Sequence, residues 1–244
     1  MRQKMLVVSA HYGDFIWSCG GSIAKYAGEN HEVNVIVLSS GIGSEIKTTG
    51  PQSAHGEKAL KEKSWRRCEK AAQILGVSNM EYWDMEETPL RMDSEKLELL
   101  ATRIRQLRPD FILTHDKEQD RLNQDHTSTA NALRTSYTIA SGAGAYCMGH
   151  PVAPRQTPMF GFEPLLHDYT RFTPNLYIDI SAFISKKELA MEVFDFNQLI
   201  TAAYTTKAIE RALEYKYWTG AEECDYAEAF SMWGAVCMHG GFVW

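Results

Sequence analysis

Histidine and aspartate occur at two places in this sequence in a pattern that could hold a divalent metal ion. His11 and Asp14 stand three residues apart on the turn after an apolar, strand-like run, and His126 follows a second such run much later in the chain. Zinc and similar ions bind imidazole nitrogens and carboxylate oxygens, and catalytic sites use about three protein ligands. These three residues are therefore candidate ligands of one metal ion, with water in the remaining position.

The residue before His126 has two interpretations. Asp125 could orient a ligand or act on the reacting groups, since metal-bound histidines usually donate a hydrogen bond to a carboxylate or carbonyl. It could equally be the N-cap of a helix, because aspartate is a favoured N-cap residue, with His126 merely in the first turn. A lone His-x-x-Asp pair is a weak signal, so the metal interpretation depends on whether the fold brings the two places together.

An alternation of short apolar runs and longer helical patterns bears on that question. It predicts an α/β fold with a mostly parallel sheet and helices on both faces. Such folds bind ligands beyond the carboxyl ends of their strands, where His11, Asp14 and His126 all fall. The polar, glycine-rich segment Gly41–Gly56 is predicted to be a loop. The predicted strands are Met5–Ala10, Val33–Ser39, Met80–Met85, Phe111–Thr114, Pro158–Phe162 and Leu176–Ile180, and the predicted helices are Ser22–Glu29, Glu57–Leu75, Ser94–Leu107, Thr127–Tyr137 and Ser185–Tyr217, the last of which could be two helices.

Length and composition indicate a single soluble domain over residues 1–244. The chain has 44% apolar and 23% charged residues, a formal net charge of −6 and a pI near 5.8. This acidity argues against nucleic acid as a partner, because such binding rests on many Lys and Arg contacts to phosphate. The five cysteines are scattered, no apolar run approaches the length of a membrane span, and no signal-peptide pattern precedes the first strand. We therefore expect no membrane association and a location in the reducing cytoplasm.

Four segments resemble the PIG-L/LmbE-like zinc deacetylases. VVSAHYGDFIWSCGGSIAKYA resembles their opening motif, an apolar strand followed by His-Pro-Asp-Asp-Glu and a Gly-Gly helix start. QDHTSTANAL resembles their second motif, CEKAAQILGV their alanine-rich helix ending in Leu-Gly, and YAEAF a recurrent late motif. The resemblance runs in order along most of the chain. It implies a Rossmann-like three-layer sandwich, a bound divalent metal, and His11, Asp14 and His126 as its ligands.

The resemblance breaks at two positions of the opening motif. Gly13 stands where the deacetylases have the aspartate that acts as general base on water, and Phe15 stands at the following glutamate position. A glycine cannot accept a proton, and general acid–base catalysis is typically worth about 10²–10⁴-fold in rate. Amide hydrolysis by the usual route should therefore be badly impaired.

The HYGDF, RLNQDH and SSGIGSE segments resemble one branch of this family. That branch is the zinc-dependent 4-oxalomesaconate hydratases, also called 4-carboxy-2-hydroxymuconate hydratases, of gallate and protocatechuate catabolism. The resemblance implies addition of water to a carbon–carbon double bond of a small anionic tricarboxylate, giving 4-carboxy-4-hydroxy-2-oxoadipate. The metal could be Zn²⁺, Fe²⁺ or Co²⁺, since nitrogen and oxygen ligands suit all three.

Two other functions stay open. The first is a zinc-dependent N-deacetylase of an N-acetylglucosamine-type substrate, with a relocated base such as Asp125 or Asp116. The second is a binding protein that kept the fold and lost its chemistry. Metal content separates the binding protein from the two enzymes, and substrate assays separate the enzymes from each other.

A hydratase needs an acid/base group in place of the missing aspartate. Glu45 is the first candidate because it lies in the loop after the second predicted strand, although it could be an ordinary solvated glutamate. His167 follows a later predicted strand and is the second candidate, with a structural, partly buried histidine as the alternative. Asp125 is the third candidate for this role.

A tricarboxylate needs local cations inside an acidic protein. Arginine binds carboxylates well because its planar fork reaches two oxygens. Arg121 lies between the fourth predicted strand and His126 and is the first candidate, whereas Arg67 is a lesser one that could be a solvated surface charge. Tyr12, inside the metal motif, could line the same pocket. We expect the metal and Arg121 to make the crevice locally positive.

The C-terminus is rich in apolar and aromatic side chains, among them Phe230, Trp233, Phe242 and Trp244. Apolar surface of this kind is often buried between subunits, which predicts a homo-oligomer. Ordinary core packing is an equally good explanation for the same residues.

Overall fold

The computed structural model of the chain describes residues 2–43, 46, 54–117, 120, 122–144, 147, 149–154, 156–165, 171–194 and 198–234. The strands in these ranges form one seven-stranded sheet in the order β3-β2-β1-β4-β5-β7-β6. The strands are β1 (Lys4–Ser9), β2 (Glu32–Ser39), β3 (Asn79–Met85), β4 (Phe111–His115), β5 (Met159–Phe162), β6 (Leu176–Asp179) and β7 (Ala227–Trp233). The helices are α1 (Asp14–Gly28), α3 (Ala54–Leu75), α4 (Ser94–Leu107), α5 (Gln124–Ser141), α6 (Ile184–Glu192) and α7 (Gln198–Thr219), with a 3₁₀ turn, η2, at Ser181–Phe183.

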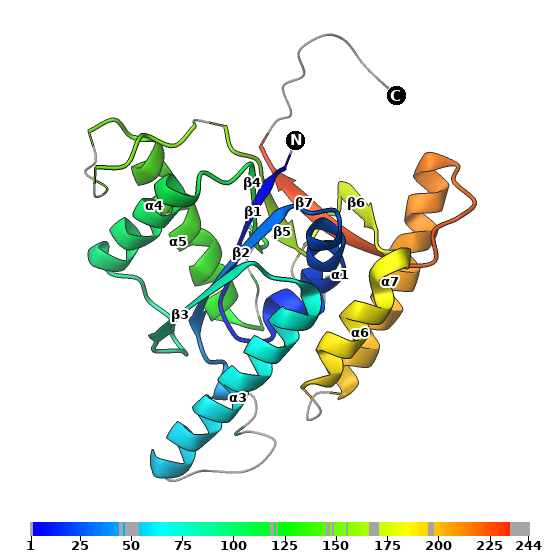
Figure 1. Cartoon of the computed structure of the whole chain (residues 1–244), viewed down its shortest axis with the longest axis horizontal. Coiled ribbons are helices and arrows are strands. Elements are labelled where there is room, and N and C mark those ends of the chain that lie inside the picture. Colours follow the sequence, from blue (N-terminus) through cyan, green and yellow to red (C-terminus); the bar gives the residue numbers. More distant parts are fainter. Residues whose placement is uncertain are drawn as a thin grey trace.

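The sheet is covered on both faces, as the apolar strand runs predict. Helices α4 and α5 lie on one side of it, and α1, α3 and α6 lie on the other (Figure 1). Alternate residues of one strand enter different cores: Leu6 and Val8 pack under α4 and α5, whereas Met5 and Val7 pack under α1 and α3. Strands buried on both faces need apolar residues at successive positions, which is why β1 and β2 read as continuous runs.

The strand order creates a crevice at a defined place. Strand β1 is paired in parallel with both β2 and β4. After β1 the chain continues to β2 on one side, and after β4 it continues to β5 on the other side. Connections after β1 and β4 therefore diverge across opposite faces, and a crevice opens between them at the carboxyl ends of the strands. The turn at His11 and the first turn of α5 both stand there.

Helix α1 begins at Asp14, eight residues before the predicted start at Ser22, so the predicted boundary is wrong. The Cys-Gly-Gly segment before the predicted start lies inside the helix. Cys19 does leave helical geometry, with φ −141° and ψ 19°, and a kink results. The Glu228 carboxylate restores the lost backbone pairing by accepting hydrogen bonds from Gly21 N and Ser22 N, at 2.8 and 2.7 Å. A side chain distant in the sequence thus stabilises a kink inside the helix, at a segment where the local sequence favours the start of a new helix.

Strand β7 was not predicted, and it makes one edge of the sheet antiparallel. It pairs antiparallel with both β5 and β6. Glu228 interrupts the apolar pattern of this segment. Its side chain is nevertheless buried, because it forms an ion pair with Lys187 Nζ at 2.7 Å. Phe230, one of the aromatic residues expected at a subunit interface, is 1% exposed in the core of the chain itself.

The remaining predicted elements are present with small shifts of their ends. The long C-terminal helical segment is two helices, α6 and α7. Most of the predicted loop Gly41–Gly56 lies outside the described residues, although α3 already begins at Ala54. None of the helices in the described ranges is both long and apolar enough to cross a membrane.

Candidate metal centre and active site

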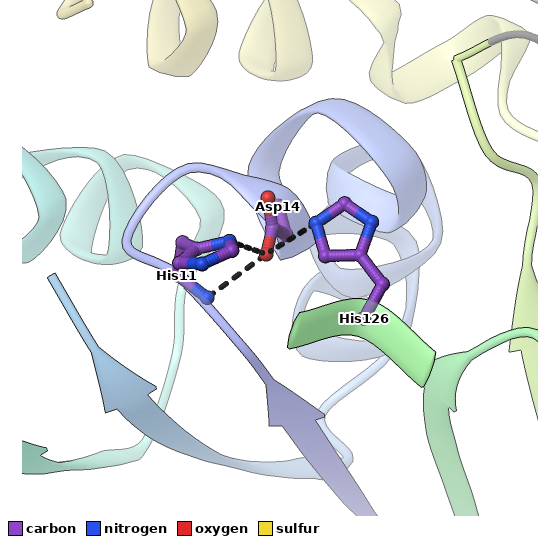
Figure 2. A group of neighbouring side chains, drawn as sticks. All are labelled: His11, Asp14 and His126. Carbon is purple, nitrogen blue, oxygen red and sulfur yellow. Dashed lines mark hydrogen bonds and ion pairs between the residues drawn. The ribbon is translucent and has the colours of Figure 1, made fainter. Parts of the chain in front are cut away.

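The fold brings His11, Asp14 and His126 together in the crevice (Figure 2). His11 lies on the turn after β1, Asp14 is the first residue of α1, and His126 is in the first turn of α5. One possible ligand atom from each residue lies within 4.8 Å of the others. The grouping predicted from the sequence is therefore the one that the structure shows.

A single oxygen atom of Asp14 is the centre of this cluster. Asp14 Oδ2 lies 3.0 Å from His11 Nδ1 and 3.4 Å from His126 Nε2. It also accepts a hydrogen bond from the His11 backbone N–H at 2.8 Å. A third imidazole, that of His115 at the end of β4, places its Nε2 3.3 Å away. Three rings thus converge on one carboxylate.

Each candidate histidine ligand has a carboxylate on its other ring nitrogen. Asp125 Oδ2 lies 3.3 Å from His11 Nε2, and Asp120 Oδ2 lies 2.9 Å from His126 Nδ1. Such carboxylate–histidine pairs fix the tautomer and the ring orientation of a metal ligand. The predicted orienting role of Asp125 therefore falls on His11 rather than on the adjacent His126, which Asp120 orients.

Asp125 is not the N-cap that its sequence position also allowed. The N-cap of α5 is Asn123, whose side chain accepts a hydrogen bond from Asp125 N at 3.0 Å. The Asp125 carboxylate instead accepts hydrogen bonds from Thr88 N and Leu90 N, at 2.9 and 2.8 Å. Together with His11 Nε2, these two donors give the carboxylate three partners, and Asp125 is 2% exposed. Asp125 therefore fixes the position of its neighbours.

Sequence reasoning missed the roles of Asp120 and His115. Asp120 has a signal in the sequence, since it is a carboxylate six residues before a candidate ligand in the same loop. The His115 ring stacks on that of His126, with centroids 4.0 Å apart and planes 18° apart, and its Nε2 accepts a hydrogen bond from Ala10 N at 3.0 Å. His115 thus contacts the cluster from the end of β4, and no local sequence motif indicates that role.

The carboxylates and imidazoles of the cluster shift one another's pKa values. Burial raises the pKa of Asp14, but the imidazoles of His11 and His126 outweigh it and hold that pKa well below its usual range. Burial lowers the pKa of His11, yet Asp14 and Asp125 raise it to about 10. The pKa of His115 falls to about 4, because burial and the neighbouring His126 disfavour its charged form. The carboxylates are thus anionic at neutral pH, with positive charge between them.

The pocket beside the cluster is also acidic. Asp14, Asp116, Asp120 and Glu163 line it together with His115 and His126, and its described lining contains no lysine or arginine. Glu163 is neutralised from behind by Lys207 Nζ at 2.8 Å and by Arg211, whose Nη2 is 2.6 Å away. The locally positive potential expected for this crevice is therefore not supplied by the described lining.

These residues fit a divalent metal ion. His126 Nε2 is buried and has no hydrogen-bond donor or acceptor among the described residues, while Nδ1 faces Asp120. A buried polar atom without a hydrogen bond is costly, and a metal ion held between His126 Nε2, Asp14 and His11 would satisfy this nitrogen, whose charged neighbour Asp14 Oδ2 is 3.4 Å away. Two imidazoles and one carboxylate suit Zn²⁺, Fe²⁺ or Co²⁺.

The glycine loop after β2 starts against this cluster. Gly41 has φ +71°, and a Cβ there would lie 2.6 Å from the Cβ of His11, so glycine is required for the approach. Glu87 anchors the loop by accepting hydrogen bonds from Gly41 N and from Gly43 N, the latter at 2.9 Å. Glu45 is two residues further on, outside the described residues.

The other predicted site residues lie elsewhere or are not described. Tyr12 is 2% exposed in the core, with ring centroids 5.5 Å from Trp65 and 4.9 Å from Tyr82. Arg67 lies on α3 in an open hollow that it shares with other basic residues of that helix. Arg121 and His167 fall outside the described residues, so their predicted roles stay predictions.

Comparison with known proteins places the chain in a family. Residues 6–137 match PIG-L, the family described as GlcNAc-PI de-N-acetylase. The chain is 30% identical to the 4-oxalmesaconate hydratase of Pseudomonas putida KT2440 over 93% of its own length and 88% of that protein. It is 26% identical to the diacetylchitobiose deacetylase of Thermococcus kodakarensis over 79% of its length and 69% of that protein.

A solved structure shows the same similarity in three dimensions. The crystal structure of the 4-carboxy-2-hydroxymuconate hydratase from P. putida KT2440 matches with a TM-score of 0.88 and 28% identity, covering 99% of this chain and 100% of that one. Matches of this extent to a hydratase, together with the family match, mean that the chain is an enzyme that belongs to the PIG-L family.

Proposed function

We propose that this enzyme is a metal-dependent hydratase of gallate and protocatechuate catabolism. Its substrate would be 4-oxalomesaconate (4-carboxy-2-hydroxymuconate), a small tricarboxylate, and its product 4-carboxy-4-hydroxy-2-oxoadipate. Zn²⁺ is the proposed cofactor, with Fe²⁺ or Co²⁺ as alternatives, held by His11, Asp14 and His126. The similarity to the P. putida hydratase, over 93% of this chain in sequence and 99% of it in structure, supports the reaction class.

The observation that carries the choice of hydration over deacetylation is at Gly13. A Cβ at this position would lie 1.7 Å from Cζ3 of Trp17, so the indole fills the space in which a side chain would begin. Trp17 is 7% exposed, donates a hydrogen bond to Thr201 Oγ1 at 3.2 Å and packs on Phe194. The position of the deacetylase base is thus physically closed as well as unoccupied by a carboxylate.

The two relocated bases considered for a deacetylase are both engaged. Asp125 is held by His11, Thr88 N and Leu90 N. Asp116 lines the pocket, but its Oδ2 accepts a hydrogen bond from Ser231 Oγ. Neither carboxylate is arranged as a replacement for the missing aspartate, which favours the hydratase.

Hydration requires one proton to leave water and one to reach carbon. In this proposal Glu45 takes the proton from water while the water oxygen bonds to one alkene carbon, and a protonated His167 gives a proton to the other. The bound metal would supply Lewis-acid polarisation of the oxo-acid group. Because the described pocket lining is acidic, Arg121 is proposed to bind a substrate carboxylate through its fork. Asp125 and Asp120 hold the two histidines.

Three further expectations belong to the same proposal. The chain acts as one domain over residues 1–244, the active form is a homo-oligomer, and the location is the cytoplasm. No nucleic-acid partner is expected from a chain with a net charge of −6.

The direct test follows two reactions with the metal-loaded enzyme. One follows the loss of dienol absorbance after addition of 4-oxalomesaconate, and the other measures acetate release from N-acetylglucosamine derivatives. We expect turnover in the first assay and none above background in the second. Acetate release without hydration would replace this proposal by the deacetylase. Inactivity in both assays would overturn it, and failure to take up metal during loading would then favour the binding protein.

Replacing Glu45 by Gln tests the proposed acid/base group. General acid–base catalysis is worth about 10²–10⁴-fold, so turnover should fall within that range while metal content stays at the wild-type level. The exposed Glu57 in the first turn of α3 provides a matched control, because Glu57→Gln makes the same change of charge away from the cluster. Near wild-type turnover of Glu45→Gln would remove this residue from the mechanism.

A further inference from the structure

The segment between β3 and α4 holds the start of the glycine loop through one side chain. Glu87 is half-buried and accepts hydrogen bonds from the backbone N–H groups of Gly41 and Gly43, which lie 46 and 44 positions away in the sequence. Hydrogen bonds to a charged acceptor are roughly twice as strong as those between neutral groups. The Glu87 carboxylate therefore fixes both ends of residues 41–43.

The loop start that Glu87 holds lies directly against His11, one of the three candidate metal ligands. A Cβ at Gly41 would lie 2.6 Å from His11 Cβ and 2.9 Å from His11 Cγ, so the backbone of Gly41 is in close contact with this side chain. Ile42, between the two glycines, is buried as well. A displacement of residues 41–43 would therefore remove a packing contact that helps to place the His11 ring.

The same segment also reaches His11 by a second route, through Asp125. The backbone N–H groups of Thr88 and Leu90 donate hydrogen bonds to the two oxygens of the Asp125 carboxylate, at 2.9 and 2.8 Å. Asp125 Oδ2 in turn lies 3.3 Å from His11 Nε2. Residues 87–90 thus hold the neighbours of His11 both at its Cβ and at its ring, although they supply none of the candidate ligands.

We propose that Glu87 is a positioning residue of the metal centre, and that it couples metal binding at His11 to the placement of residues 41–43. This inference rests on the metal centre of the proposed function and adds to it a segment that contributes no ligand. Groups that orient metal ligands typically contribute about 10–100-fold to metal affinity. The coupling is reciprocal: if the metal binds more tightly when residues 41–43 lie against His11, the bound metal holds these residues there by the same factor.

Titration of Glu87→Gln with Zn²⁺ against a chelator tests the positioning role. Glutamine keeps the shape of the side chain but replaces one of the two acceptors by an NH₂ donor, so one backbone N–H loses its partner and Zn²⁺ affinity should fall about 10-fold or more. Glu86→Gln is the matched control, since Glu86 is exposed and the charge changes equally one position away. A purely structural role would lower only the melting temperature of the metal-free protein. Equal Zn²⁺ affinities of the two variants would overturn the proposal.

Amide hydrogen exchange on the wild type keeps the test valid if Glu87→Gln impairs folding. Saturating Zn²⁺ should slow exchange at Gly41 and Gly43 by about 10-fold or more, because exchange there reports the local opening that the metal opposes. Gly76 is the control: its N–H donates to Gln73 O at 3.1 Å in the turn before β3, and its exchange rate should not change. Unchanged exchange at Gly41 and Gly43 with Zn²⁺ bound would overturn the coupling and leave the metal centre standing, whereas a wild type that binds no Zn²⁺ would overturn both.

Discussion

Replacing Asp14 by Asn is expected to abolish stable metal binding and to lower turnover by about 10³-fold or more. Asp14 Oδ2 lies within 3.4 Å of a nitrogen of each of His11, His115 and His126, so the whole cluster depends on its charge. Lewis-acid polarisation contributes several kcal/mol to charge stabilisation, and about 4 kcal/mol corresponds to a 10³-fold change in rate. Bound metal is measured by elemental analysis, and turnover by dienol absorbance.

The same series separates ligands from the residues that orient them. Asp120→Asn keeps the three candidate ligands and removes only the charge behind His126, so metal affinity should fall about 10–100-fold and return at high metal concentration. The strongly exposed Asp225 gives the control Asp225→Asn, which should leave both quantities unchanged. Wild-type turnover by a metal-free Asp14→Asn enzyme would contradict the assignment of the metal centre.

The candidate ligands could be predicted because a general rule applies to them. A parallel sheet places its strand ends at one edge, so His11 and Asp14 after β1 and His126 after β4 were expected to meet, although 112 positions separate Asp14 from His126. The roles of Asp120 and His115 could not be predicted in the same way. They depend on which ring nitrogen faces which carboxylate, and that is decided by loop geometry rather than by spacing in the sequence.

The errors in the fold share one physical cause, a buried glutamate. Glu228 interrupts the apolar pattern of β7, so the sequence pattern does not predict that strand. The same carboxylate accepts a hydrogen bond from Gly21 N at the kink of α1, the helix that was predicted to start too late. Its charge is balanced by Lys187, which comes from a helix 41 residues away. Local patterns assume that charged residues are exposed, so a buried ion pair misleads them at both elements.

Gly13→Asp is expected to lower stability and to give no deacetylase activity, although it restores the sequence motif of the deacetylases. The new Cβ would lie 1.7 Å from the Trp17 ring, and relief of such overpacking in a core typically costs about 1–3 kcal/mol. The melting temperature should fall accordingly. Gly144→Asp is the control, because a Cβ at Gly144 meets nothing within 4 Å.

Adding Trp17→Leu to Gly13→Asp should recover part of the lost stability, because leucine lacks the ring atoms that occupy the space beside position 13. The two substitutions should therefore be coupled: the double variant should be more stable than the sum of the single effects by about 1 kcal/mol or more. The same double variant opens the volume that a base at position 13 needs, so any acetate release from N-acetylglucosamine derivatives should appear in it and not in Gly13→Asp alone. Additive effects on stability, or a Gly13→Asp enzyme as stable as the wild type, would show that Trp17 does not close this position. The preference for hydration would then rest on the absence of the aspartate alone.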